Sequence, residues 1–277
     1  MNFKGAWVTH VGMKKPKNED SIFFGNRCLW GRSMDAPEAV AHDETACLIG
    51  VADGVGGHNA GETASRLCVE AVAGLKEISK SNVDSLLKNL NREIYEKSVD
   101  DSSLQGMGTT VAGLGLGDDC LFAFNVGDSR VYSFHAERGL ERVTVDDSLR
   151  ERGDLETRTP MPLASSNVIT QALGGRKTFK EITPNHYDLD AGEDGLYLIC
   201  SDGLNDMVED DRIEEILGAP DAASELVKTA GSLLRAALDG GGRDNVSIVL
   251  ASHSQMDSKV RSDAQGWLGR LLGRDRR

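Results

Sequence analysis

Four aspartates occupy the same kind of position in the sequence, each where an apolar run meets a loop. Asp20 precedes SIFF, Asp53 follows CLIGVA, Asp202 follows GLYLICS, and Asp244 opens DNVSIVL. Asp53 and Asp202 are each followed by glycine, which lets the backbone approach a ligand closely. A single Asp–Gly pair is most often a turn, but four acids on rigid supports of this kind indicate a shared site.

The chemistry of such a site follows from its charge. Carboxylates that converge in a poorly hydrated place repel one another, so they must be protonated, paired with cations or neutralised by metal. No run of Lys or Arg tracks these acids one for one. Oxygen ligands without neighbouring Cys or His favour Mg²⁺ or Mn²⁺ over zinc. Two such ions activate a water and hold a phosphoryl group for in-line displacement.

The loop after Asp53 is rich in glycine and contains one histidine, in the stretch DGVGGHNAGE. It lacks the GK[ST] ending of a nucleotide-binding P-loop. His58 has a side chain that titrates near neutral pH, so it is a candidate general acid for a leaving alcohol oxygen. The alternative is that His58 caps a helix that begins near Glu62.

The elements that position these residues are short strands and two helical blocks. Strand-like runs rich in Val, Ile, Phe and Tyr include GAWVTHVG, DSIFFGN, ACLIGVADG, GLYLICSDG and NVSIVLASH. Residues 109–135 predict three further strands joined by GDD and GDS turns, as an antiparallel meander. Helical spacing covers about 60–98 and 209–238. This order is not a βαβ alternation, and it predicts antiparallel sheets flanked by helices.

Composition excludes several classes of protein. The 277-residue chain has a formal charge of −13, which argues against binding to duplex nucleic acid. Its five cysteines are dispersed without a CxxC pair, as in a reduced cytosolic protein without zinc or disulfides. No run has the length of a membrane span, and the N-terminus lacks the apolar core of a signal peptide. We therefore expect a cytoplasmic monomer without a transmembrane segment.

The end of the chain differs from the rest. We expect one domain over residues 1–254, followed by a basic amphipathic tail over residues 255–277. Trp267, Leu268, Leu271 and Leu272 would share one face of a short helix in that tail. The alternative is a loosely docked or frayed terminus.

Six motifs occur in order: NED (18–20), VADGVGGHNAGE (51–62), GMGTTVAGL (106–114), NVGDSRVY (125–132), LYLICSDGLND (196–206) and GGRDNVSIVL (241–250). Together they resemble the metal-dependent PPM, or PP2C-type, serine/threonine phosphatases in their compact bacterial form. The resemblance spans about residues 5–251. It implies an α+β fold, a four-layer α-β-β-α sandwich of two antiparallel sheets flanked by helices.

The resemblance also implies roles for individual residues around two Mn²⁺ or Mg²⁺ ions. Asp53 would bridge both ions, and the Gly54 carbonyl would ligate one of them. Asp202 and Asp244 would complete the shell of the second ion. Glu19 and Asp20 would act at the first ion, partly through water. A third, weaker ion would be held with the help of Asp128.

One position departs from the family pattern. The phosphate-binding arginine usually lies five residues before the aspartate of NED, and here that residue is Lys15. Lysine supplies a compact charge rather than a bidentate fork, so weaker or less selective phosphate binding is expected. Thr109 and Thr110 are expected to support the strand behind the site, and Arg130 to pair with nearby acids. The polar stretch 148–174 would contain a flap that selects substrate.

The function implied by the resemblance is hydrolysis of phosphoserine and phosphothreonine by attack of a metal-bridging hydroxide. Its partners would be phosphorylated proteins, with a bacterial Ser/Thr kinase whose action the phosphatase reverses. Two alternatives stay open: a catalytically weak phosphoprotein-binding regulator of the same fold, and a metal-dependent hydrolase of other phosphate esters.

Overall fold

The computed structural model describes residues 3–42, 46–55, 60–117, 120–149, 151, 168–190 and 195–253. The strands are β1 (Phe3–His10), β2 (Ser21–Phe24), β3 (Arg27–Trp30), β4 (Glu38–His42), β5 (Cys47–Ala52), β6 (Gly54–Val55), β7 (Gly108–Thr109), β8 (Val111–Leu116), β9 (Leu121–Val126), β10 (Arg130–His135), β11 (Gly139–Arg142), β12 (Leu173–Gly174), β13 (Asn185–Leu189), β14 (Gly195–Cys200) and β15 (Val246–His253). The helices are α1 (Ala60–Ala73), α2 (Lys80–Asp100), the 3₁₀ turn η1 (Ser102–Leu104), α4 (Asp202–Asn205), α5 (Asp210–Leu217) and α6 (Leu226–Asp239).

Most strands lie in two large antiparallel sheets. Over the described residues, the first sheet has the order β11-β10-β14-β15-β1-β4 and the second the order β13-β9-β8-β5-β2-β3. A small third sheet, β12-β7-β6, lies beside the end of β5. Neighbouring strands pair antiparallel throughout both large sheets.

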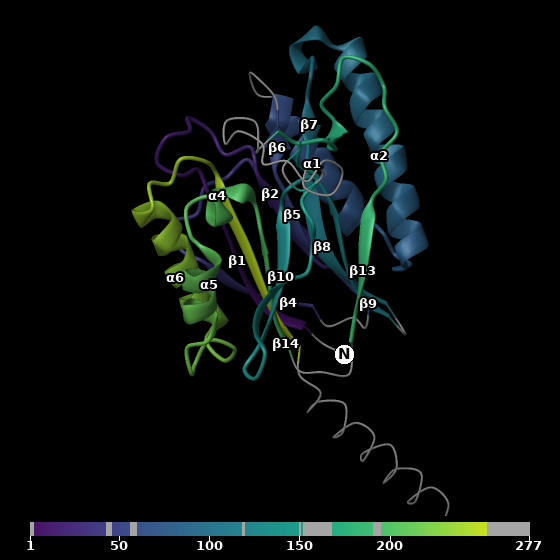
Figure 1. The fold of residues 1–277 in the computed structure, drawn as a ribbon. Helices are drawn as coiled ribbons and strands as arrows, with labels where there is room; N and C mark the ends of the chain where they lie inside the picture. The colour runs from purple at the N-terminus through teal and green to yellow at the C-terminus, as the bar shows by residue number, and fades with distance from the viewer. Residues whose placement is uncertain are drawn as a thin grey trace, which may run out of the picture.

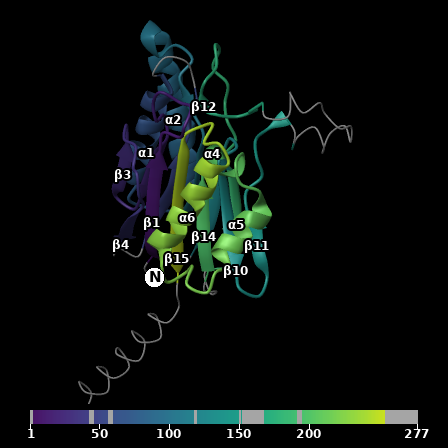
Figure 2. The same ribbon diagram turned by 90° about the vertical axis from the view of Figure 1, so that its left-hand side faces the viewer.

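The two large sheets form the middle layers of the molecule, and helices cover their outer faces (Figure 1). Helices α1 and α2 lie on the second sheet, while α4, α5 and α6 lie on the first, as Figure 2 also shows. This arrangement confirms the predicted four-layer α-β-β-α sandwich. Among the described helices, none combines the length and the apolar character needed to cross a bilayer.

Alternation along the strands produces the layers. In β2, Ile22 and Phe24 belong to the core cluster that contains the sheet-to-sheet contacts, whereas Phe23 packs in the cluster with α1 and α2. In β5, Ile49 belongs to the cluster between the sheets and Leu48 to the cluster with α1 and α2. All five side chains are at most 2% exposed. Successive side chains of a strand point to opposite faces of the sheet, so both faces of the second sheet are buried.

The predicted meander over residues 109–135 is only partly correct. Strand β9 pairs with β8 as expected, but β10 lies in the other sheet, where it pairs with β14 and β11. Gly127 has a φ of 107°, and its N–H and C=O both bond to Asp147 instead of closing a hairpin. The GDS segment is therefore a crossover between sheets, and it places Asp128 at the edge where both sheets end.

The register of the strands collects the acids at that edge. Ser21 pairs with Ala52, so Asp20 and Asp53 lie side by side at the ends of β2 and β5. Arg130 pairs with Cys200, which brings the start of β10 to the end of β14. Because β15 begins beside the end of β14, Asp244 joins the same edge. Antiparallel pairing thus gathers residues that are far apart in sequence.

Candidate metal centre

Asp20 is the most buried of the acids, with 1% of its surface exposed. Its Oδ2 accepts a hydrogen bond of 2.8 Å from Ser201 Oγ, while Oδ1 is buried without a hydrogen-bond partner. Burial raises the pKa of Asp20 to about 7, and the charges of Asp202 and Asp244 add to this rise. Hydrogen bonds from Ser247 and Ser201 act in the opposite direction. The carboxyl group therefore lacks the counter-charge that a buried carboxylate needs.

Asp53 is held by its backbone. Its carbonyl oxygen accepts bonds of 2.9 Å from Thr110 N and from Thr109 Oγ1, and its own N–H donates to Thr110 Oγ1. Thr109 and Thr110 thus support the strand behind the site, as the sequence predicts. Desolvation raises the pKa of Asp53 well above its ordinary value, and the surrounding carboxylates, led by Asp20 and Asp202, raise it further.

Gly54 is required by a close approach of three backbone segments. A Cβ placed on Gly54 would lie 2.4 Å from the carbonyl oxygen of Gly61 and 2.5 Å from that of Glu19. The Glu19 carbonyl in turn accepts a bond from Ser65 Oγ of α1. The start of α1 and the NED segment are therefore packed directly against the backbone beside Asp53. Glu19 itself is half-buried, and burial raises the pKa of its carboxyl group.

Asp202 begins α4, at the end of β14. Its neighbour Gly203 lies so close to the next segment that a Cβ would be 1.9 Å from the carbonyl oxygen of Asn245. Burial raises the pKa of Asp202 to about 6, and Asp244 adds to this rise; a hydrogen bond with Asp53 opposes it. Asp53 and Asp202 therefore influence each other's charge although β5 and β14 belong to different sheets.

Asp244 is partly exposed and is paired with the residue at the family's arginine position. Lys15 Nζ lies 2.7 Å from Asp244 Oδ1, and the N–H of Asn245 donates to the same oxygen. Partial burial lowers the pKa of Lys15, but the hydrogen bond and charge of Asp244, together with the charges of Asp53 and Asp202, give a net rise. Lys15 thus pairs directly with an acid of this edge, although Lys14, Lys15 and Lys17 are all exposed.

Asp128 lies at the same edge, on the crossover between the sheets. Burial raises its pKa to about 7, with further contributions from the charges of Asp202, Asp146 and Asp206. Asp206 follows α4, and the sequence reasoning did not single it out although it lies within LYLICSDGLND. It stands four residues after Asp202, which places both acids on one side of a helical turn.

Arg130 is part of a hydrogen-bonded network behind Asp128. Its Nε and Nη2 donate to the two carboxylate oxygens of Asp146 at 3.0 and 2.7 Å, and Nη1 donates to Tyr132 Oη. Tyr132 Oη donates to Asp210 Oδ1 at the start of α5. The expectation that Arg130 pairs with nearby acids is confirmed. The bidentate geometry fixes the start of β10, and with it the backbone next to Asp128.

Two asparagines and a serine, which the sequence reasoning missed, tie the acid-bearing segments together. Asn245 Nδ2 donates to the carbonyl oxygens of Val11 and Lys17, and its Oδ1 accepts from Glu19 N, all at 2.8–2.9 Å. It is 4% exposed. The loop that carries Lys15 is therefore anchored to the start of β15.

Asn18 does the same for the other side of that loop. Its Nδ2 donates to Thr9 Oγ1 and to the Arg32 carbonyl, and its Oδ1 accepts from Asp20 N. Ser201 adds the bond to Asp20 already described. Both asparagines stand next to an acid in the motifs NED and DN, which is the signal in the sequence that marks them.

The acids at this edge suit a hard divalent cation, both because their ligand atoms are oxygens and because several of these oxygens are buried. The acids are oxygen ligands, and Asp20 Oδ1 and Asp202 Oδ1 are buried without partners. Burial, together with the repulsion of neighbouring carboxylates, raises the pKa values of Asp20, Asp53 and Asp202, and a bound cation would relieve both effects. Over the part of the chain that is described, no three His, Cys, Asp or Glu side chains already surround one point as a metal site. Asp20 is bonded to Ser201 and Asp244 to Lys15, so cation binding requires these two carboxylates to turn from their present partners.

Three expectations lie outside the described residues. His58 belongs to the segment 56–59, so neither its role as general acid nor the alternative of a helix cap can be placed. Most of the stretch 148–174 that would contain the flap also lies outside, although Leu173–Gly174 forms β12 against β7. The tail over residues 255–277 is likewise outside.

Three comparisons place this geometry among known proteins. Residues 32–228 match the family model described as protein phosphatase 2C. This match contains Asp53, Asp128 and Asp202, while Lys15 and Asp244 lie beyond it. The chain is 31% identical over 249 residues to the serine/threonine protein phosphatase PstP of Mycobacterium tuberculosis, covering 87% of this chain and 43% of that protein. The chain thus spans less than half the length of this relative.

A second relative is matched along almost its whole length. The protein phosphatase PhpP of Streptococcus pneumoniae is 27% identical over 270 residues, which cover 91% of this chain and 98% of that protein. Among solved structures, the catalytic domain of PstP in complex with two manganese ions superposes with a TM-score of 0.71 at 31% identity. That alignment covers 91% of this chain and 99% of the solved one.

Proposed function

Because the chain belongs to the protein phosphatase 2C family, we propose that it is a metal-dependent phosphoprotein phosphatase that hydrolyses phosphoserine and phosphothreonine. The observation that carries this proposal is the gathering of acids from both sheets at one edge, with buried oxygens that have no partner. Such a cluster calls for a cation, and the manganese complex of PstP supports the choice of metal.

The residues that would hold two Mn²⁺ or Mg²⁺ ions follow from the edge geometry. Asp53 would serve both ions and the Gly54 carbonyl one of them. Asp202 and Asp244 would hold the second ion, Glu19 and Asp20 would act at the first, partly through water, and Asp128 would help to hold a third. When bound, the ions neutralise the carboxylates and supply an activated water for attack on phosphorus. The hydrogen bonds from Thr109 and Thr110 keep Asp53 in place during the reaction, which limits the cost of reorganisation.

Lys15 binds the phosphoryl group of the substrate in this proposal. Its pairing with Asp244 supports this assignment, since it places an ammonium group at the open side of the acidic edge. An incoming phosphate offers the ammonium a second anion while the carboxylate turns toward the cation. The compact ammonium donates to one oxygen at a time, so orientation of the phosphate depends more on the rest of the site than with an arginine.

His58 is proposed as the general acid that protonates the leaving serine or threonine oxygen. In the sequence it stands between Val55, the last residue of β6, and Ala60, the first residue of α1, and β6 directly follows Asp53. An imidazole that titrates near neutral pH supplies a proton at physiological pH.

The biological setting is proposed from the relatives. Serine/threonine phosphatases of bacteria are the proteins that this chain resembles, and a bacterial Ser/Thr kinase would supply its phosphorylated substrates. All five cysteines are free thiols, and three of them are buried. Free thiols of this kind support a reducing, cytoplasmic location.

The test is Mn²⁺-dependent hydrolysis of phosphoserine and phosphothreonine peptides, with p-nitrophenyl phosphate as a small ester. We expect Asp53→Asn and Asp202→Asn to abolish turnover of every substrate. Wild-type rates in both variants would overturn the assignment of the site. Peptide binding without turnover in the wild-type chain would support the regulator instead, and turnover of the small ester alone would support a hydrolase of other phosphate esters.

A further inference from the structure

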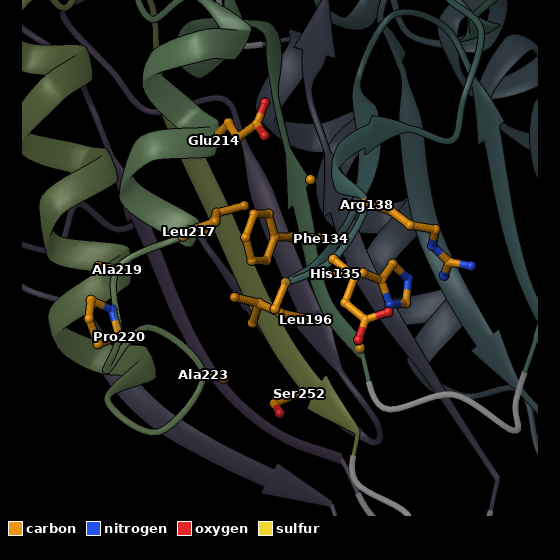
Figure 3. A pocket seen from close by; sticks show the side chains of 15 residues that line it. Phe134, His135, Arg138, Leu196, Glu214, Leu217, Ala219, Pro220, Ala223 and Ser252 are labelled. Atoms are coloured by element: carbon orange, nitrogen blue, oxygen red, sulfur yellow. The ribbon is translucent and has the colours of Figure 1, made fainter.

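A groove lies at the end of the sandwich opposite the acids (Figure 3). Its volume is about 1110 Å³, and it is formed by the end of β10, the start of β14, the β10–β11 turn and the segment that joins α5 to α6. The acids follow β14 and precede β10 and β15, whereas the groove is reached at the other ends of these strands. Six residues of strand, about 20 Å, separate the two places.

The groove combines an apolar floor with a rim that carries charge. Phe134, Leu196 and Leu217 form the floor, and Figure 3 shows them pointing toward one another between the sheet and α5. Glu137 and Glu214 stand on the rim with one cation, Arg138. An apolar floor with a rim of this kind suits an amphipathic segment that bears positive charge.

The chain itself supplies such a segment at the edge of the groove. Ser252 lines the groove, and the described part of β15 ends one residue later. The sequence continues for 24 residues, which contain six Lys or Arg against three Asp. Within them, Trp267, Leu268, Leu271 and Leu272 have the spacing of one helical face. The rest of the chain is strongly acidic, so the segment and the domain have opposite net charge.

We propose that the tail, residues 255–277, docks in this groove of its own domain through Trp267, Leu268, Leu271 and Leu272. The thirteen residues between His253 and Trp267 span about 20 Å as a flexible chain, which is enough to reach the floor from Ser252. Tethering at the rim gives the apolar residues an effective concentration of about millimolar, so a modest apolar contact suffices for docking. The groove is thus an internal binding site, separate from the metal centre.

The test follows Trp267 in the full chain. The sequence has three tryptophans, so a 5-fluorotryptophan-labelled protein gives three ¹⁹F signals, of which Trp267→Phe identifies one. We expect the Trp267 signal to be shielded several-fold from a soluble gadolinium chelate. Ala219→Arg fills the groove at an exposed loop position and should remove this shielding. Asn89→Arg, the same charge change on the exposed face of α2, should leave it intact.

A variant in the tail provides an independent test in case Ala219→Arg does not fold. Leu271→Asp leaves the folded domain unchanged, and it should both expose Trp267 and speed amide hydrogen exchange in residues 217–223. Equal exposure of Trp267 in the wild-type and Ala219→Arg chains would overturn the proposal. Loss of the shielding on dilution would also overturn it, because this would indicate binding to a second copy of the chain. Shielding that appears only with vesicles of anionic phospholipid, and that Ala219→Arg does not change, would overturn it as well.

Discussion

Lys15 Nζ lies 2.7 Å from Asp244 Oδ1, which joins the segment before β2 to the residue two positions before β15. The two side chains are 42% and 39% exposed, so the pair itself adds little to stability. Its importance lies in position, because Lys15 is a cation that meets the acidic edge. The same ammonium group neutralises an acid in the free protein and faces the place where a phosphoryl group would enter.

Lys15→Ala should therefore raise KM for phosphopeptides by about tenfold, the value of one hydrogen bond to a charged group, with a smaller change in kcat. Lys15→Arg should restore or lower KM, since guanidinium binds phosphate in a bidentate manner. Lys14→Ala is the matched control on an exposed neighbour. Steady-state kinetics at saturating Mn²⁺ measures all three, and an unchanged KM in Lys15→Ala would return this residue to the solvated surface.

The metal-free protein should lose stability as pH rises. Burial raises the pKa of Asp20 to about 7 and that of Asp202 to about 6, from 3.8. The folded state thus binds these protons more tightly than the unfolded chain. The resulting contribution to the free energy of unfolding is fully present at low pH and is lost between about pH 4 and about pH 7. Thermal unfolding in EDTA should show Tm falling over this range.

Metal should reverse that trend. Added Mn²⁺ should raise Tm more at about pH 8 than at about pH 5, because the ligands must be deprotonated to bind. Asp20→Asn removes one of the titrating groups and should flatten the pH dependence of the metal-free protein. A Tm in EDTA that rises steadily up to neutral pH would contradict the charge state assigned to the edge.

Asn245 is predicted to matter both for stability and for metal affinity. Asn245→Ala leaves two carbonyl oxygens and the Glu19 N–H without their buried partner, which should lower the free energy of unfolding by about 2–4 kcal/mol. Loss of the anchor for Glu19 and Asp244 should weaken Mn²⁺ binding by about 10–100-fold. Urea unfolding and calorimetric titration measure the two effects.

The matched control is Asn89→Ala, an exposed asparagine on α2. Asn245→Asp keeps an acceptor for Glu19 N but removes both donors. Its losses in unfolding free energy and Mn²⁺ affinity should therefore resemble those of Asn245→Ala. Wild-type Mn²⁺ affinity in Asn245→Ala would show that the loop that carries Lys15 keeps its conformation without the hydrogen bonds of Asn245.

Gly203 tests the close approach of α4 to the start of β15. Because a Cβ would lie 1.9 Å from the Asn245 carbonyl oxygen, Gly203→Ala must move backbone and should destabilise the fold by about 1–3 kcal/mol. Gly231 in α6 is the control, since its added Cβ would meet Pro37 at 3.8 Å, an ordinary contact. Gly231→Ala should stabilise by about 0.5–1 kcal/mol through helix propensity. Equal effects in the two variants would argue against the crowding at Gly203.

The network of Arg130 makes a separate prediction about the support of Asp128. Asp146 is 8% exposed and receives a bidentate pair of bonds from the guanidinium. Removing one partner by Arg130→Met leaves the buried carboxylate of Asp146 with only Arg142 Nη1, 3.9 Å from Oδ2, and should cost about 3 kcal/mol. The double variant Arg130→Met, Asp146→Leu should recover much of that loss. Chemical denaturation of the three proteins measures the effect, and strictly additive single losses would speak against a coupled pair.

The sequence was sufficient for the architecture because its signals are local. Apolar runs of strand length, helical spacing in two blocks and acids at the ends of strands are each visible within a few residues. These local signals predicted antiparallel sheets flanked by helices, whereas the four-layer order and the support given by Thr109 and Thr110 were implied by the family resemblance. The meander failed at one point, because the path after Gly127 is decided by which sheet has an open edge for β10, and that is not a local property.

The site divides in the same way between sequence and structure. Sequence alone determined which residue types are present at the strand ends, and hence that oxygen ligands and a lysine, rather than thiols or an arginine, serve this edge. Tertiary structure decided what those residues meet: the contact of Lys15 with Asp244, the hydrogen bond of Asp20 with Ser201, and the anchoring of the loop by Asn245. These depend on antiparallel register and on desolvation, which arise only when segments distant in the chain are packed together.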